Sequence, residues 1–131
     1  MAKAIGLFLF FLAALVCHLR GGDAQQFCPA SDISFTVDKT GLFYDGQPEY
    51  KVTFQTQCPC PMVAVHVTCD GVDGSAAPLD ASKVEVDDSM CVLKQPVVPG
   101  TPYWFNYALA APVNFRVFSG HSDCGVSDRP H

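Results

Sequence analysis

Cysteine number and placement constrain this chain more than any other feature. Six cysteines follow an apolar leader and are spread over a mature segment of about 100 residues. An even number of cysteines in a short exported chain indicates a disulfide framework rather than free thiols. The sequence therefore predicts an oxidising compartment outside the cytosol and a small fold crosslinked by Cys28, Cys58, Cys60, Cys69, Cys91 and Cys124.

The N-terminal segment has the three parts of a secretory signal. Lys3 supplies a positive start, residues 5–16 form an apolar run, and Ala24 is a small residue suited to the cleavage site. The apolar run is shorter than the roughly 20 residues that span a bilayer, so we expect a secreted, extracellular chain that is not inserted in the membrane. The expected organisation is a signal peptide at 1–24, a cysteine-rich domain at 25–124 and a flexible C-terminal tail at 125–131.

Composition narrows the range of partners. Cleavage after Ala24 leaves residues 25–131, a length suited to one domain. It also removes Lys3, Arg20 and Asp23, which changes the formal net charge from −5 to −6. A chain this acidic is not expected to bind nucleic acid or an anionic membrane.

Alternation of apolar and polar residues recurs along the mature chain, whereas helical periodicity is nearly absent. Tyr103, Phe105 and Tyr107, for example, share one face of a predicted strand and leave Trp104 on the other. Runs of this kind, rich in β-branched and aromatic residues, are typical of half-buried strands. The pattern predicts strands near residues 32–38, 48–57, 63–69, 84–86, 103–107 and 113–117.

Turn sequences separate the predicted strands. Asp45-Gly46 and Pro99-Gly100 suit tight turns, and Asp70-Gly71 opens a loop of small residues. Six or seven short strands with one apolar face each bury those faces by forming two sheets. The predicted fold class is all-β: a small, disulfide-stabilised antiparallel β-sandwich of about six to eight strands.

The strand order limits the crosslinks without fixing them. If the first two predicted strands pair in antiparallel fashion, Cys28 lies near the cysteine pair at 58–60. The cysteine left over there is then within reach of Cys124, and Cys69 and Cys91 can bond across the long loop. Six cysteines allow fifteen connectivities, so this pattern stays a hypothesis at the level of sequence.

Short motifs between the cysteines resemble those of a known family. They include a Gly-x-Pro-x-Tyr stretch at 46–50, the Cys-x-Cys pair at 58–60 and an aromatic run that ends in Tyr107-Ala108. In this order, over essentially the whole mature domain, they resemble the plant tapetum determinant family of small secreted cysteine-rich proteins. Further matching elements are Asp32-Ile33, Cys69 with Gly71, Cys91-Val92-Leu93, Pro99-Gly100, Pro112 and Cys124.

The resemblance implies that the protein is a ligand. Founding members of the family are extracellular signals that a leucine-rich-repeat receptor kinase reads, and they direct cell fate in the developing anther. The expectation is an apoplastic, non-enzymatic signalling protein whose partner is the extracellular domain of such a receptor. The chain departs from the founding members in its short pro-region, in Asp70, which interrupts the usual Cys-Gly, and in the residues after Cys124.

Loops at one end of the sandwich are the expected binding region, because their side chains are free of core packing. The candidate segments are 41–47, 70–82 and 119–131. The acidic middle segment suits basic residues on a receptor, so we single out Asp73, Asp80 and Asp87 as candidate partner-binding residues.

Trp104 leaves two interpretations open. A strand that is apolar on both faces would bury it, whereas an exposed indole would anchor a protein partner or stack on a sugar ring. The alternative function is therefore an extracellular cell-wall carbohydrate-binding module, with Trp104 and nearby tyrosines as its stacking platform.

Motifs for catalysis or metal binding are not recognisable. Cys58 and Cys60 lack two further ligands at the spacing of a zinc site, and a Gly-x-Ser-x-Gly elbow or phosphate loop is missing. We therefore expect no enzymatic activity, no metal and no cofactor. Five aspartates do not follow the spacing of a calcium loop and are better explained as turn residues: Asp70, Asp73, Asp80, Asp87 and Asp88.

Overall fold

Seven antiparallel strands in two sheets form the fold, which confirms the predicted β-sandwich. The structure, a computed structural model, describes residues 27–124, so the predicted signal peptide and the predicted tail at 125–131 lie outside the described residues. The strands are β1 (Ile33–Tyr44), β2 (Gln47–Thr56), β3 (Met62–Thr68), β4 (Val84–Asp87), β5 (Met90–Leu93), β6 (Tyr103–Ala108) and β7 (Arg116–Ser122), with short 3-10 turns η1 (Ala30–Asp32) and η2 (Val72–Gly74).

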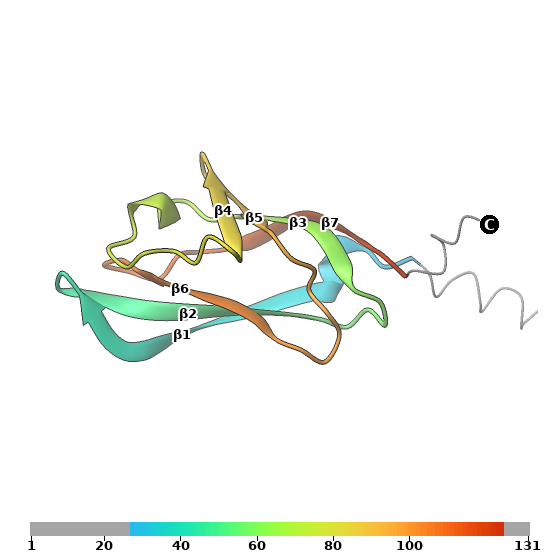
Figure 1. The fold of residues 1–131 in the computed structure, drawn as a ribbon, viewed down its shortest axis with the longest axis horizontal. Helices are drawn as coiled ribbons and strands as arrows, with labels where there is room; N and C mark the ends of the chain where they lie inside the picture. The colour runs from blue at the N-terminus through green and yellow to red at the C-terminus, as the bar shows by residue number, and fades with distance from the viewer. Residues whose placement is uncertain (1–26, 125–131) are drawn as a thin grey trace, which may run out of the picture.

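The two sheets lie one above the other (Figure 1). The three-stranded sheet has the order β1-β2-β6, and the four-stranded sheet has the order β4-β5-β3-β7. Strands β1, β6, β4 and β7 are therefore the edges of the two layers. The β1–β2 hairpin turn and the loop after β3 lie at one end of the sandwich, whereas the β2–β3 corner and the C-terminal end of β7 lie at the other (Figure 1).

Inward-facing residues of the alternating strands form an aromatic core. Phe115 is 1% exposed, and its ring stands at steep angles to the rings of its neighbours. Centroid separations of about 6 Å suit edge-to-face packing. The neighbouring rings are Phe35 at 6.0 Å, Phe54 at 6.0 Å, Phe105 at 6.3 Å and Tyr107 at 5.7 Å.

The prediction of a loop at 41–47 is wrong, because the first two strands form a long hairpin through this segment. Strand β1 continues to Tyr44 past an irregularity between Lys39 and Phe43, and β2 begins at Gln47. The turn consists of Asp45 and Gly46, both with positive φ (52° and 79°). Two positive φ values match the twist of a two-residue hairpin, so the strands pair up to the turn itself.

The C-terminal strand was also misplaced. The prediction put it at 113–117, but β7 runs from Arg116 to Ser122. Val113 and Phe115 are buried from the preceding loop, where Val113 N–H donates to the Tyr107 hydroxyl (2.9 Å). The alternation that they show therefore reflects burial without strand pairing.

Two further strands depart from the sequence pattern. Strand β5 was not predicted, although its Cys91 and Leu93 are buried as in any half-buried strand. In β3 the register shifts between Val63 and His66, and Ala64 takes a positive φ of 53°. This bulge makes Met62 rather than Val63 an inward-facing residue.

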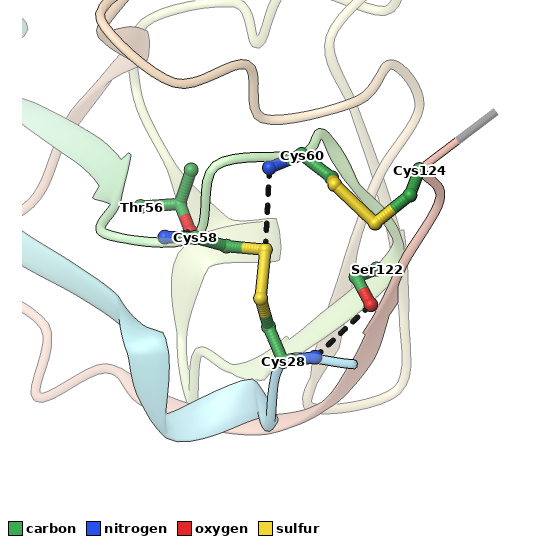
Figure 2. The surroundings of a disulfide bond; sticks show 6 residues. All are labelled: Cys28, Thr56, Cys58, Cys60, Ser122 and Cys124. Atoms are coloured by element: carbon green, nitrogen blue, oxygen red, sulfur yellow. Dashed lines mark hydrogen bonds between the residues drawn. A yellow bond between two sulfur atoms is a disulfide. The ribbon is translucent and has the colours of Figure 1, made fainter. Parts of the chain in front are cut away.

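Three disulfides crosslink the sandwich, and they resolve the ambiguity at the β2–β3 corner. Cys28 bonds Cys58 and Cys60 bonds Cys124, with Cα–Cα distances of 5.9 and 4.9 Å (Figure 2). The N–H of Cys28 also donates to the Ser122 hydroxyl (3.1 Å), which ties the start of the domain to β7. The third bridge joins Cys69 and Cys91, as predicted.

Candidate interaction surface

A surface groove crosses the outer face of the four-stranded sheet near the end of β3. Its centre is a row of cross-strand partners, because Met90 on β5 pairs with both Asp87 on β4 and Thr68 on β3, and Thr68 pairs with Arg116 on β7. The hollow has a volume of about 660 Å³. We call it the acidic groove; it is lined by Thr68, Asp70, Asp87, Asp88, Ser89, Met90, Asn114 and Arg116.

The chemistry of the acidic groove suits a basic side chain. Three carboxylates and one guanidinium give it a formal charge of −2, and Met90 adds an apolar surface beside them. Lysine and arginine have an aliphatic stem that packs on apolar surface and a cationic head that binds carboxylates. The groove can therefore accept a lysine or arginine side chain from a partner.

A second feature is the tip of the β1–β2 hairpin, residues 42–46, which we call the hairpin tip; it lies at the end of the sandwich that also carries the loop after β3 (Figure 1). Leu42 and Phe43 are 57% and 66% exposed. The irregularity in β1 produces this exposure, because Gly41 has a φ of 95° and the register shifts beside it. Two adjacent large apolar side chains on a protruding turn are a suitable anchor for a protein partner.

The structure separates the three aspartates singled out from the sequence. Asp87 lines the acidic groove, whereas Asp73 is exposed on η2 and is not among the groove residues. The Asp80 carboxylate stabilises its own turn, because it accepts hydrogen bonds from the Ser82 hydroxyl (2.6 Å) and the Ser82 N–H (3.0 Å). These bonds, with the charge of Lys83, lower the pKa of Asp80.

The three predicted binding segments do not lie at one end. Residues 119–122 belong to β7, and Cys124 is bonded to Cys60 at the end opposite the hairpin tip. That part of the prediction is wrong, because β7 continues through the polar residues that suggested a tail. The 70–82 loop is at the expected end, but it is fastened to β6 by the Ala76 N–H, which donates to the Ala108 carbonyl (2.9 Å).

Trp104 points outward from the three-stranded sheet, so the interpretation as a core residue is wrong. Its side chain is 38% exposed, whereas Tyr103 and Tyr107 on the other face of β6 are 9% and 0% exposed. The predicted platform of Trp104 with nearby tyrosines is therefore not formed by these two tyrosines. Instead, two lysines surround the indole: the Nζ atoms of Lys51 and Lys83 lie 4.5 and 3.9 Å from the ring centroid.

One cluster at the opposite end has the spacing of metal ligands. Atoms of Cys28, Asp32 and Cys58 lie within 4.8 Å of one another. The two sulfur atoms are bonded to each other, so neither is a thiolate ligand while the disulfide is intact. Between residues 27 and 124, no helix is long and apolar enough to cross a membrane.

Comparison with known proteins identifies the family. Residues 29–124 match the family described as Tapetum determinant 1, C-terminal. The chain belongs to this family. The match covers the sandwich from the residue after the first disulfide cysteine to the last one, which confirms the resemblance seen in the sequence. No curated protein and no solved structure matches the chain.

Several residues on the surface of this tapetum determinant domain were not anticipated. Leu42 and Phe43 lay within the candidate segment 41–47 but were not singled out, and their consecutive bulky side chains were the signal that could have marked an exposed tip. Asp70 lay within the candidate segment 70–82 without being singled out, and Asp88 was interpreted as a turn residue. Arg116 gave no signal, because its place in the groove depends on the pairing of β7 with β3.

Proposed function

We propose that this tapetum determinant protein is a secreted, non-enzymatic signal that binds the extracellular domain of a leucine-rich-repeat receptor kinase in plant cell-fate control. The end of the sandwich that carries the hairpin tip and the acidic groove makes the contact. Membership of the family supports the class of function. The observation on which the location depends is the exposure of Leu42 and Phe43 at the end of the sandwich that also carries the loop after β3 (Figure 1), which contributes Asp70 to the groove.

The two features have complementary roles in such a contact. Large apolar side chains at the centre of an interface contribute most of the binding free energy. Charged residues around them steer the encounter and select the partner. The hairpin tip is therefore the anchor, and the acidic groove takes a basic side chain from the receptor.

The end of the sandwich opposite the hairpin tip has a structural role, which supports placing the receptor contact at the hairpin tip. Two of the three disulfides and the hydrogen bond from Cys28 to Ser122 lie there. The hairpin tip is at the other end of the long β1–β2 pair, where its exposed side chains contribute little to the core. Substitutions at the tip can therefore change binding without unfolding the domain.

The test is capture of the secreted, oxidised chain by a set of purified leucine-rich-repeat ectodomains, followed by affinity measurement with variants of the bound pair. The double variant Leu42→Ser/Phe43→Ser is expected to weaken binding at least about tenfold. Asp70→Asn/Asp87→Asn/Asp88→Asn, which leaves the turn residue Asp80 intact, is expected to weaken it in a salt-dependent way.

Phe27→Ser is the matched control. Phe27 is 77% exposed but lies beside Cys28, at the crosslinked end. Its substitution removes a comparable apolar side chain and is expected to leave the affinity unchanged. Binding to no ectodomain would contradict the receptor assignment, and equal weakening by Phe27→Ser and the hairpin-tip variant would contradict the location.

A further inference from the structure

The surroundings of Trp104 concentrate positive charge on an acidic protein. The described residues include five lysines and arginines, and two of them place their ammonium groups over this one ring. Lys83 Nζ also donates to the Trp104 carbonyl oxygen (3.0 Å). Asp38 is the cross-strand neighbour of Lys51, and the charge of Lys83 acts on Asp80, but within residues 27–124 neither ammonium forms an ion pair within 4.0 Å. The cluster of Lys51, Lys83 and Trp104, which we call the indole site, therefore has two ammonium groups that no carboxylate of the described residues contacts directly.

The fold holds both lysines in place. Lys51 on β2 pairs with Asn106 on β6. The next outward-facing residue of β2 is Thr53, which pairs with Trp104. Lys83 precedes β4 at the edge of the other sheet, where its carbonyl accepts a hydrogen bond from the Tyr103 hydroxyl (2.5 Å). Because Tyr103 is the neighbour of Trp104, the same strand positions the indole and fixes the backbone of the lysine that covers it.

The face around the indole site is polar. The outward-facing residues of β1, β2 and β6 around Trp104 are mainly hydroxyl and amide side chains. The cores of protein interfaces are apolar, which this face is not. A planar array of hydroxyls and amides around a single indole suits a saccharide, which has one apolar ring face and many hydroxyl groups. The surrounding residues are Ser34, Thr36, Asp38, Thr53, Gln55 and Asn106.

We propose that the indole site binds an acidic saccharide, an oligomer of uronic acid residues. The sugar ring stacks on the indole, and its carboxylate accepts hydrogen bonds from Lys51 and Lys83. A cation–π contact at an exposed site is weaker than a charge-assisted hydrogen bond to a carboxylate. The lysines therefore gain by turning from the ring to the ligand. A neutral sugar would displace them without a compensating charge, so the site selects acidic sugars.

The indole site is distinct from the surface proposed for the receptor. Thr53, beside Trp104, is six residues along β2 from Gln47 at the hairpin turn. At 3.2–3.4 Å per residue this is roughly 20 Å. The protein can therefore hold an acidic wall polymer and a receptor at separate places.

The single tryptophan of the chain makes a direct test possible. The secreted, oxidised chain is titrated with an oligogalacturonide of defined length while Trp104 fluorescence is recorded. We expect a saturable change. The double variant Lys51→Gln/Lys83→Gln is expected to weaken binding about tenfold or more, because two charge-assisted contacts are lost. The methyl-esterified oligomer, whose carboxylates are masked, is expected to bind at least about tenfold more weakly than the acid form.

Two controls decide between this site and a general attraction of anions. Arg116→Gln removes a positive charge from β7 of the other sheet and is expected to leave the affinity within about twofold, since surface charges at a distance are screened. Polyglutamate matched in charge tests an acidic protein partner and is expected not to saturate. The proposal is overturned if the oligogalacturonide gives no saturable change, if the esterified oligomer or polyglutamate binds equally well, or if Arg116→Gln weakens binding to the same degree as Lys51→Gln/Lys83→Gln.

Discussion

Two tyrosines of β6 show how single residues link the layers of the sandwich. The Tyr107 hydroxyl accepts a hydrogen bond from the Val113 N–H (2.9 Å), which holds the buried loop before β7. The Tyr103 hydroxyl donates to the Lys83 carbonyl and accepts from the Gln95 N–H (3.2 Å) at the edge of the other sheet. Both hydroxyls must stay protonated to keep this environment, because burial raises the pKa of each phenol above its usual 10.0.

These pKa values predict a loss of stability at alkaline pH. In the unfolded chain the two phenols ionise near pH 10, whereas in the folded chain they ionise at higher pH. The stability that depends on neutral phenols is therefore fully present below pH 10 and is lost as the pH rises through the folded-state pKa values. Urea unfolding at several pH values between about 8 and 11 measures this decline. A free energy of unfolding that stays constant across that range would contradict the prediction.

Among the elements, the β1–β2 hairpin depends most on the backbone of one residue. Its turn has positive φ at both Asp45 and Gly46, and no side chain lies within 4 Å of where a Gly46 Cβ would be. Strain at Gly46 would therefore arise from backbone conformation alone. A left-handed conformation costs an L-residue with a side chain roughly 1–2 kcal/mol.

Gly46→Ala is accordingly expected to lower the free energy of unfolding by about 1 kcal/mol, the backbone strain less the entropy that alanine removes from the unfolded chain. Gly74→Ala is the matched control, since Gly74 on η2 has no positive φ and equally open space at its Cβ. That substitution is expected to raise stability slightly or leave it unchanged. Chemical denaturation of the two variants provides the comparison, and equal effects would show that the turn does not impose this strain.

The sequence was sufficient to predict the elements that alternate in the ordinary way. Strands β2 and β6 follow the expected alternation over most of their length, and it is interrupted only where Glu49 is buried beside Tyr50 and Ala108 beside Tyr107. Prediction failed where tertiary pairing overrides the pattern. The bulge at Ala64 shifts the inward face of β3, and the polar end of β7 pairs with Met62 and Val63 although its own sequence resembles a tail.

The candidate surface was less predictable than the fold. The acidic groove brings together residues from β3, β4, β5 and β7, so its composition depends on strand register and not on any local motif. The outward direction of Trp104 followed from alternation, and so did the inward direction of Tyr103 and Tyr107. The predicted platform of Trp104 with nearby tyrosines did not apply this alternation, and the burial of Tyr103 and Tyr107 excludes them from it. The approach of Lys83 to the indole had no signal in the sequence, because it joins the edges of two different sheets.

The molecule as a whole is crosslinked unevenly. The Cys60–Cys124 bridge closes a separation of 64 residues and lies with Cys28–Cys58 at one end, whereas Cys69–Cys91 closes 22 residues inside the core. Chain entropy alone favours the longer loop, by about 1 kcal/mol on the usual logarithmic dependence. The shorter-loop bridge is nevertheless the better protected from solvent, because Cys69 and Cys91 are both 0% exposed.

Access to the sulfur atoms is expected to decide the order of reduction under native conditions. A thiolate must reach the disulfide to attack it, and Cys60 and Cys124 are both partly exposed. With increasing dithiothreitol, Cys60–Cys124 is therefore expected to open first and Cys69–Cys91 last. Alkylation followed by peptide mapping identifies the freed cysteines at each step. Early opening of the buried bridge would show that the four-stranded sheet unfolds locally before the crosslinked end does.

The distribution of charge leads to a prediction about association with the proposed receptor. The acidic groove has a formal charge of −2 on a chain whose formal net charge is −5, so a basic partner is attracted before contact. Screening lengths fall from about 30 Å at 0.01 M salt to about 8 Å at 0.15 M. The association rate is therefore expected to fall roughly tenfold between these salt concentrations, with little change in dissociation. Stopped-flow binding of the captured ectodomain measures both rates. In the Asp70→Asn/Asp87→Asn/Asp88→Asn variant the dependence of the association rate on salt should largely disappear. A dependence as steep as in the unmodified chain would show that the electrostatic contact is not made by the groove.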